Sequence, residues 1–164
     1  MTELPWLLPV WAAFVVAGAV AARPLGRMLG SGPLVAWMLV ASAGLVIAST
    51  LTPFSGVPVL YPECGLGGLH LASARELRQS GDIMLNVLLL VPLGVAIGAI
   101  PRTRVRIALA ALAALAPLAI EMTQLNFAPL HRSCEAADVV NNAGGLLVAV
   151  AAGIVLRRAH DAAR

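Results

Sequence analysis

Long apolar stretches alternate with short polar segments along this chain of 164 residues. A helix that crosses the hydrocarbon core of a bilayer needs about 20 predominantly apolar residues. Five stretches come close to that length, at residues 4–22, 33–51, 83–100, 105–122 and 137–156. The pattern therefore predicts an all-α fold, a polytopic bundle of about five transmembrane helices that forms one domain over residues 1–164.

The composition supports this interpretation. Hydrophobic residues make up 60% of the chain and charged residues 12%, and the mean hydropathy is +0.90. Soluble domains carry about 25% charged residues, and a small one cannot hide so much apolar surface. The composition excludes a water-soluble domain and indicates a lipid bilayer as the main partner. No nucleic acid partner is predicted, because the basic residues are scattered along the chain.

All basic residues apart from histidine are arginines, and the predicted spans divide them unequally. One side of the bundle receives Arg23, Arg27, Arg102, Arg104, Arg106, Arg157, Arg158 and Arg164. The other side receives Arg75, Arg78 and Arg132. Cytoplasmic segments of membrane proteins are enriched in Arg and Lys. We therefore predict an N-terminus outside and a C-terminus in the cytoplasm.

Small and aromatic residues within the stretches each allow two interpretations. Gly94 and Gly98 stand one turn apart, so they either permit a close helix contact or only fill lipid-facing positions. Trp6, Trp11 and Trp37 are either interfacial anchors or packing residues. Neither feature indicates a ligand site.

Two loops face outside in this topology, at about residues 52–81 and 126–136. The longer loop begins with several prolines and glycines and then becomes polar and helix-like. Ser73 and Glu76 stand three residues apart, the spacing of a capping box. The spacing predicts a short interfacial helix in this loop.

Each outer loop contains one of the two cysteines of the chain, Cys64 or Cys134. Two cysteines on one oxidising side of a membrane are candidates for a disulfide. Two unpaired thiols are the second interpretation. A third is a zinc site in which the cysteines join His70 and His131 as tetrahedral ligands, although the spacings match no compact metal motif. We predict no metal and no other cofactor.

Ionisable and amide groups inside apolar stretches are costly in lipid, and they usually face a protein interior or a water-filled cavity. Eight such groups lie within or beside the last three stretches. They are Asp82, Asn86, Glu121, Gln124, Arg132, Glu135, Asp138 and Asn142. Carboxylate and amide stand three or four residues apart on each helix, hence on one helical face. Because neighbouring helices are antiparallel, the eight groups converge at one level and predict a ligand-binding pocket near the outer leaflet.

Most of these residues also have a purely structural interpretation. Asp82 and Asp138 stand where a carboxylate can cap a helix and favour its positive end. Arg132 can neutralise Glu135 or Asp138 at the membrane edge. Glu121 is different, because it lies inside an apolar helix that has no local need for a charge.

The same residues resemble the VanZ-like family of small bacterial membrane proteins. Its members show an Asp, an Asn and then Pro-Leu-Gly in one helix, as Asp82, Asn86 and 92–94 do here. They later show Glu-x-x-Gln, an Arg, two acidic positions, an Asn and a Gly. The corresponding residues are Glu121, Gln124, Arg132, Glu135, Asp138, Asn142 and Gly145. The resemblance covers about residues 82–145, and Glu135 departs from it because the family more often has Asp there.

The resemblance implies a multi-pass protein of the bacterial cytoplasmic membrane with a role in the cell envelope. The founding member of the family is linked to low-level resistance to the glycopeptide antibiotic teicoplanin. The resemblance therefore implies an effect on teicoplanin susceptibility. It attaches no reaction to the chain.

Three functions are compatible with these residues. The favoured one is binding of an amphiphile, either a lipid-linked wall precursor or a glycopeptide-type antibiotic. Arg132 and the backbone N–H groups that begin the third and fifth stretches would receive an anionic headgroup, and Asn86, Glu121, Asp138 and Asn142 would hold its hydroxyl or amide groups. The second is an intramembrane hydrolase or transferase with Glu121 or Asp138 as general base and Arg132 steadying a developing anion. The third is a small transporter, which five spans without an even-numbered repeat disfavour.

Overall fold

The computed structural model describes residues 4–53, 55, 64–67, 69–130 and 132–163. Its secondary-structure elements are helices, separated by irregular segments. They are α1 (Leu7–Leu29), α2 (Pro33–Thr50), α3 (Ala74–Gln79), α4 (Gly81–Leu89), α5 (Val91–Gly98), α6 (Thr103–Asn126), the 3₁₀ helix η1 (Ala128–Leu130) and α7 (Ala136–Ala162). Within the described ranges the only β pairing is a single isolated bridge between Gly65 and Glu135, so the all-α prediction is confirmed.

Five helices in the described part of the chain are long and apolar enough to cross a membrane. They are α1, α2, the α4–α5 pair, α6 and α7. Each overlaps most of one stretch predicted from the sequence. The largest difference is at α1, which extends past the predicted end and includes Arg23 and Arg27 before it stops at Gly30. Gly30 has a φ of 68°, and glycine adopts this left-handed conformation without the steric cost of a side chain.

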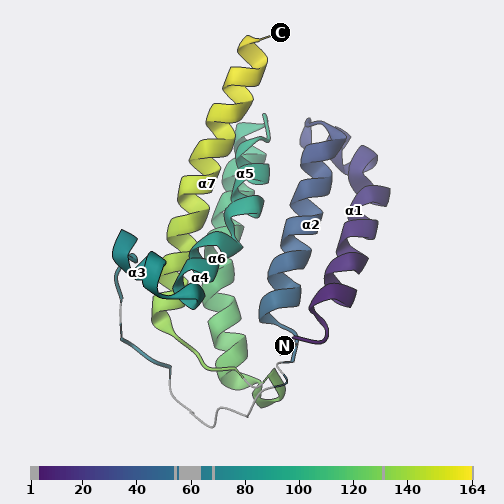
Figure 1. Ribbon diagram of the computed structural model, residues 1–164. Helices are drawn as coiled ribbons and strands as arrows, with labels where there is room; N and C mark the ends of the chain where they lie inside the picture. Colours follow the sequence, from purple (N-terminus) through teal and green to yellow (C-terminus); the bar gives the residue numbers. More distant parts are fainter. Residues whose placement is uncertain (1–3, 54, 56–63, 68, 131, 164) are drawn as a thin grey trace.

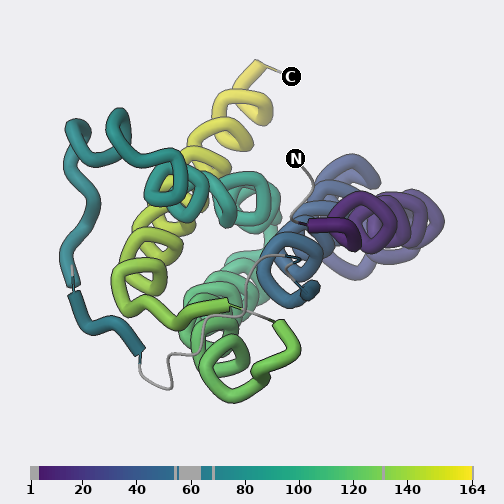
Figure 2. Tube along the Cα trace, turned by 60° about the horizontal axis from the view of Figure 1, so that its bottom comes forward, coloured from purple at the N-terminus to yellow at the C-terminus, as the bar shows by residue number. Residues whose placement is uncertain are grey.

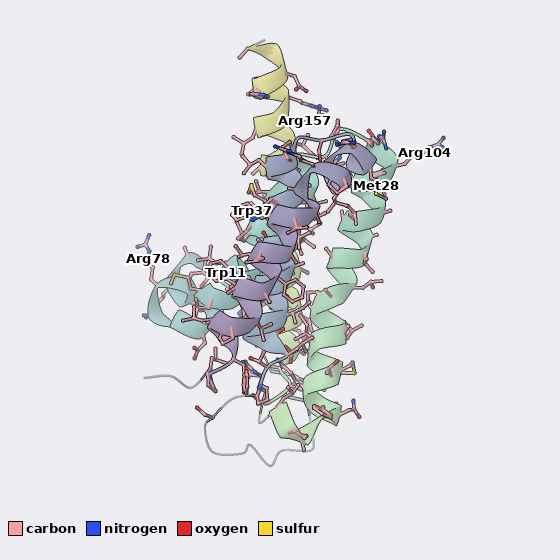
Figure 3. The ribbon with its side chains drawn as sticks, turned by 90° about the vertical axis from the view of Figure 1, so that its right-hand side faces the viewer. Trp11, Met28, Trp37, Arg78, Arg104 and Arg157 are labelled. Atoms are coloured by element: carbon pink, nitrogen blue, oxygen red, sulfur yellow. A yellow bond between two sulfur atoms is a disulfide. The ribbon has the colours of Figure 1, made fainter. Side chains whose placement is uncertain are left out.

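The long helices alternate in direction (Figure 1), and this gives the bundle two different ends. We call one the arginine-rich end; it holds the α1–α2 turn, the α5–α6 turn and the last turns of α7. Figure 3 shows Met28, Arg104 and Arg157 together at this end. We call the other the loop end; it comprises residues 49–52, 64–67, 69–86 and 121–130 with 132–142. Which of the two faces the cytoplasm stays a prediction.

Glycines bring α5 and α7 unusually close together. A Cβ atom added to Gly98 would lie 2.3 Å from the Val150 carbonyl oxygen, and one added to Gly153 would lie 2.3 Å from the Val95 carbonyl oxygen. Helices in membranes associate through such small residues because lipid offers no hydrophobic drive for helix association. The close-contact interpretation of the glycines in the third span is therefore confirmed.

The third span is broken into α4 and α5 at Leu90. Pro92 stands in the first turn of α5. Proline has no N–H for the helical ladder, and its ring clashes with the carbonyl of the residue four positions earlier, which is Leu88. The break tilts α4 away from the axis of α5 (Figure 1), and Leu90 itself is fully buried in the core.

The α1–α2 hairpin lies at the edge of the bundle, with α1 outermost (Figure 2). Trp11 Nε1 donates to the Ala41 carbonyl at 3.1 Å, and Trp37 Nε1 donates to the Val15 carbonyl at 3.2 Å. Each helix therefore donates one of these bonds to the other. Trp11 and Trp37 (labelled in Figure 3) are therefore packing residues of the hairpin.

Candidate functional site

Among the described residues of the loop end, four carboxylate or amide side chains are buried. The exposed fraction is 4% for Glu121, 8% for Gln124, 3% for Asn141 and 6% for Asn142. The view from this end (Figure 2) shows the helices that carry them, α6 and α7, beside α4 and α2. Buried polar groups are costly unless they find hydrogen-bond partners, so their contacts explain how this end is organised.

Glu121 lies near the end of α6, and its carboxylate reaches the start of α7. Its Oε2 atom accepts a hydrogen bond from the Glu135 backbone N–H at 2.7 Å. The charges of Asp138, Glu135 and Arg132 all act on this carboxylate. Glu121 thus connects the fourth and fifth spans and stands at the centre of a charged cluster.

Asp138 occupies the first turn of α7 and is half-buried. Asn86 of α4 forms a side-chain hydrogen bond with it. Asn142, one turn further along α7, donates from Nδ2 to the Asp138 backbone carbonyl at 2.9 Å. Three of the residues predicted for the site are therefore in contact across two helices.

The structural interpretation of Asp82 and Asp138 is wrong in one part, because neither residue occupies the cap position of its helix. Ser80 caps α4, with its hydroxyl accepting from the Ile83 N–H at 3.4 Å. Glu135 holds the cap position of α7 and makes no side-chain capping bond. Asp82 is exposed in the first turn of α4, and its charge acts on Asp138. Both aspartates lie one or more residues inside the helix, where a carboxylate favours the positive helix end without capping it.

Arg132 and Gln124 both attach the site to the C-terminal end of α2. Arg132 donates from Nη2 to the Ser49 carbonyl at 2.5 Å, and Gln124 donates from Nε2 to the Thr50 carbonyl at 3.0 Å. Burial lowers the pKa of the Arg132 guanidinium, while the negative charge of Glu121 acts in the opposite direction. The arginine is therefore held between α2 and the cluster.

Three backbone N–H groups at the start of α7 are engaged within the protein. The Glu135 N–H donates to Glu121, the Ala136 N–H donates to the Gly65 carbonyl at 2.9 Å, and the Asp138 N–H donates to the Glu135 carbonyl at 3.0 Å. At the start of α4, the Ile83 N–H is likewise engaged by Ser80. These particular N–H groups, expected from the sequence to receive an anionic headgroup, already have protein acceptors.

A disulfide joins Cys64 to Cys134, whose Cα atoms are 4.6 Å apart. The disulfide prediction is confirmed. Because both sulfur atoms are bonded to each other, the unpaired-thiol and zinc interpretations are wrong for this state of the protein. His131, the fourth ligand of the zinc interpretation, lies outside the described residues.

Beside the disulfide, the two loops form the isolated β-bridge. The Gly65 N–H donates to the Cys134 carbonyl at 2.9 Å, and the Gly65 carbonyl accepts from Ala136. The residue held between these two bonds is Glu135, whose own N–H reaches Glu121. The disulfide and the bridge therefore fix the segment that supplies the hydrogen bond to the buried carboxylate.

An open hollow of about 610 Å³ lies over the disulfide. Its lining residues are Cys64, Gly65, Leu66, Gly67, Ser133, Cys134 and Glu135. Of the eight residues predicted for the site, Glu135 alone lines it. None of Asn86, Glu121, Arg132, Asp138 and Asn142 lines it, so the hollow is separate from the cluster that these five residues form.

The sequence interpretation missed three residues of this end. Asn141 accepts a hydrogen bond from the Ala72 N–H at 3.0 Å through its Oδ1 atom, which holds the segment before α3 against α7. Ser49 and Thr50 contribute through their backbone carbonyls. The paired asparagines, Asn141 and Asn142, were a usable signal, whereas a backbone carbonyl gives none.

A sequence model of the VanZ/LLP1 family matches residues 32–157. The chain belongs to the VanZ/LLP1 family. The match covers α2 to most of α7, and so it includes the whole charged cluster and both cysteines, while α1 lies outside it. No curated protein and no solved structure matches this VanZ/LLP1 chain.

Proposed function

We propose that this VanZ/LLP1 membrane protein binds an amphiphile of the bacterial cell envelope at its loop end. The amphiphile is a lipid-linked wall precursor or a glycopeptide-type antibiotic. Its polar headgroup contacts the charged cluster, which we define as Asn86, Glu121, Arg132, Asp138 and Asn142. Its acyl tails remain in the surrounding bilayer.

The observation that carries the proposal is the buried carboxylate of Glu121, which is only 4% exposed. Burying a charge costs several kcal/mol unless it is paired and hydrogen-bonded, and within a membrane span such residues are usually functional. A neutral Gln would accept the Glu135 N–H equally well, so the link between α6 and α7 does not require a charge. The charge is therefore better explained by a ligand than by the fold.

The surface beside the cluster suits an amphiphile. Leu85 and Leu88 of α4 are exposed by 62% and 49%, and they lie one residue before and two residues after Asn86. In a bilayer these side chains would contact acyl chains while Asn86 contacts Asp138. Apolar and polar groups thus meet at one level of one helix, as a molecule with a headgroup and tails requires.

Two observations support placing the loop end at the outer side of the bacterial cytoplasmic membrane. Arginines accumulate at the opposite end, including Arg104 and Arg157 (Figure 3), and cytoplasmic segments are enriched in them. The Cys64–Cys134 disulfide lies at the loop end, and disulfides persist on oxidising sides of membranes. The proposed ligand then enters from the outer leaflet.

The experiment is a teicoplanin susceptibility measurement in a strain that lacks this gene. The strain is complemented with wild type, Glu121→Gln, Arg132→Ala or Asp138→Asn at equal membrane levels. The matched control is Asp161→Asn, which makes the same chemical change as Asp138→Asn but at the other end of α7. Asp161 is exposed there and pairs with Arg157. We expect wild type and Asp161→Asn to restore the susceptibility of the parent strain and the three cluster variants to fail.

Two results would contradict the proposal. If deletion leaves both the susceptibility and the lipid profile of the strain unchanged, the protein has no envelope role of this kind. If Asp138→Asn and Glu121→Gln complement as well as wild type does, the envelope role does not use the charged cluster.

A further inference from the structure

The charge balance around the charged cluster is acidic, with four carboxylates and one arginine. The carboxylates of Asp82, Glu121, Glu135 and Asp138 act on one another or on their neighbours in the cluster. Within the described part of this end, Arg132 is the cation that acts on Glu121. Arg132 also donates to the Ser49 carbonyl. The balance of charge here attracts a cation more strongly than an anion.

Three backbone donors at the start of α7 that could hold an anion are in use. The Glu135, Ala136 and Asp138 N–H groups at the start of α7 donate to oxygen atoms of the protein. A helix N-terminus binds anions through such N–H groups when they point at the ligand. Engaged N–H groups cannot serve in this way, so these three are not available to a bare phosphate.

An acceptor, in contrast, is buried and unsatisfied. The side-chain carbonyl oxygen of Asn142 has no hydrogen-bond partner among the described residues, and Asn142 is only 6% exposed. The Asn142 amide nitrogen donates to the Asp138 backbone carbonyl, so the oxygen lies beside the cluster on the face of α7 that carries Asp138. Nearly all buried polar groups in proteins have a partner, and this oxygen requires a donor.

The inference from these observations rests on the proposed function and refines it. We propose that the headgroup bound by the cluster carries a primary ammonium group. An ammonium group offers three N–H donors and no acceptor, which complements an acidic cluster that includes an unsatisfied carbonyl oxygen. Asp138 and Glu121 supply the opposite charge, and Asn142 supplies the neutral acceptor.

The test compares lipids that share their acyl chains and differ in the headgroup. Purified protein with its disulfide intact is titrated in detergent micelles with dioleoyl phosphatidylethanolamine, phosphatidylcholine or phosphatidylglycerol, and binding is measured by native mass spectrometry. Phosphatidylcholine is the decisive control, because it has the same charges as phosphatidylethanolamine but no N–H donor. The same titrations are made with Asn142→Leu, Asp138→Asn and the control Asp161→Asn.

We expect wild type to bind phosphatidylethanolamine about tenfold more tightly than the other two lipids, which corresponds to one charge-assisted hydrogen bond. Asn142→Leu and Asp138→Asn should lose this preference, and Asp161→Asn should keep it. The comparison of the three lipids on the wild-type protein needs no variant. It therefore tests the ammonium inference even if a variant fails to fold.

The outcomes separate the two proposals. If binding depends on Asp138 but phosphatidylcholine or phosphatidylglycerol binds as well as phosphatidylethanolamine, the ammonium inference is wrong and the proposed function stands. A preference for phosphatidylethanolamine that survives both Asn142→Leu and Asp138→Asn also overturns the inference, because the ammonium group then binds elsewhere. If the binding of every lipid is independent of the cluster, both proposals fail.

Discussion

The arginine-rich end and the loop end are both charged, but they hold their charges in different ways. At the arginine-rich end most charged side chains are exposed. There Arg102 donates to the Met28 carbonyl, and Arg157 pairs with Asp161 one turn along α7 at 2.8 Å. At the loop end the Glu121 carboxylate is buried between helices and accepts from a backbone N–H of another segment.

The segments that connect the helices also differ between the two ends. Short turns at residues 30–32 and 99–102 close the arginine-rich end. Long segments close the loop end, and the Cys64–Cys134 disulfide ties them together across 70 positions of sequence. Exposed ion pairs contribute little to stability, whereas a buried charge requires an organised surrounding. Burial and crosslinking thus distinguish the proposed binding end from the arginine-rich end.

The largest expected effect on stability comes from removing the crosslink. Cys64→Ser should lower the free energy of unfolding by about 2–4 kcal/mol, because a disulfide restricts the unfolded chain. Chemical unfolding of the purified protein in micelles, followed by circular dichroism, measures the change. A reductant should reproduce the effect in wild type and leave Cys64→Ser unaltered. Equal stability of the variant and the oxidised wild type would show that the loop end is organised without the disulfide.

Two arginine substitutions compare the ends directly. Arg132→Ala should lower the free energy of unfolding by about 1–3 kcal/mol, because it removes a hydrogen bond from a charged donor to the Ser49 carbonyl. Arg104→Ala at the exposed arginine-rich end should change it by less than about 0.5 kcal/mol. The same unfolding measurement gives both values. Equal effects of the two substitutions would contradict the proposed difference between the ends.

The smallest effect concerns exposed charges that belong to the loop end. The Ser73 hydroxyl and backbone N–H, followed by His70, donate to the Glu76 carboxylate and lower the pKa of Glu76 to about 2. Because the pKa is lower in the folded state, the contribution of Glu76 to the short helix α3 is complete above pH 4.5 and is lost as the pH falls from 4.5 to about 2.

Hydrogen exchange of the α3 amides over that pH range measures the loss, after correction for the intrinsic exchange rate at each pH. Ser73→Ala should accelerate exchange by roughly fivefold at pH 6, since it removes a capping residue. It should leave the rest of the bundle unchanged. An effect that spreads to α6 or α7 would mean that the exposed and buried charges of the loop end are coupled.

The sequence predicted the spans and the end at which the polar groups converge, and physical reasons explain why. The length of an apolar stretch is fixed by the thickness of the bilayer, and a spacing of three or four residues places Glu121 and Gln124 on one face of a helix. The break at Leu90 was also within reach, because Pro92 cannot continue the helical hydrogen bonds of α4. The Ser73–Glu76 capping box was predicted and is confirmed.

Tertiary partners could not be predicted in the same way. The acceptors for Arg132 and Gln124 are the backbone carbonyls of Ser49 and Thr50, and every residue has such a carbonyl. The capping interpretation of Asp138 is wrong because Glu135 occupies the cap position of α7. Glu135 is held there by the bridge to Gly65, which lies 70 residues earlier in the chain.

The account depends most directly on a specific ligand at the loop end, and photo-crosslinking in living cells tests this claim. A photoreactive amino acid replaces either Leu85, beside the cluster, or Val155, near the arginine-rich end. These positions are matched, because they are exposed by 62% and 63%. The lipids attached to each purified protein are identified by mass spectrometry in the wild-type, Asp138→Asn and Asp161→Asn backgrounds.

The account predicts that one class of amphiphile is enriched at position 85, and that Asp138→Asn abolishes this enrichment while Asp161→Asn preserves it. The lipids captured at position 155 should not respond to either substitution. If position 85 captures the same lipid mixture in all three backgrounds, the charged cluster does not select a ligand and the central claim is wrong.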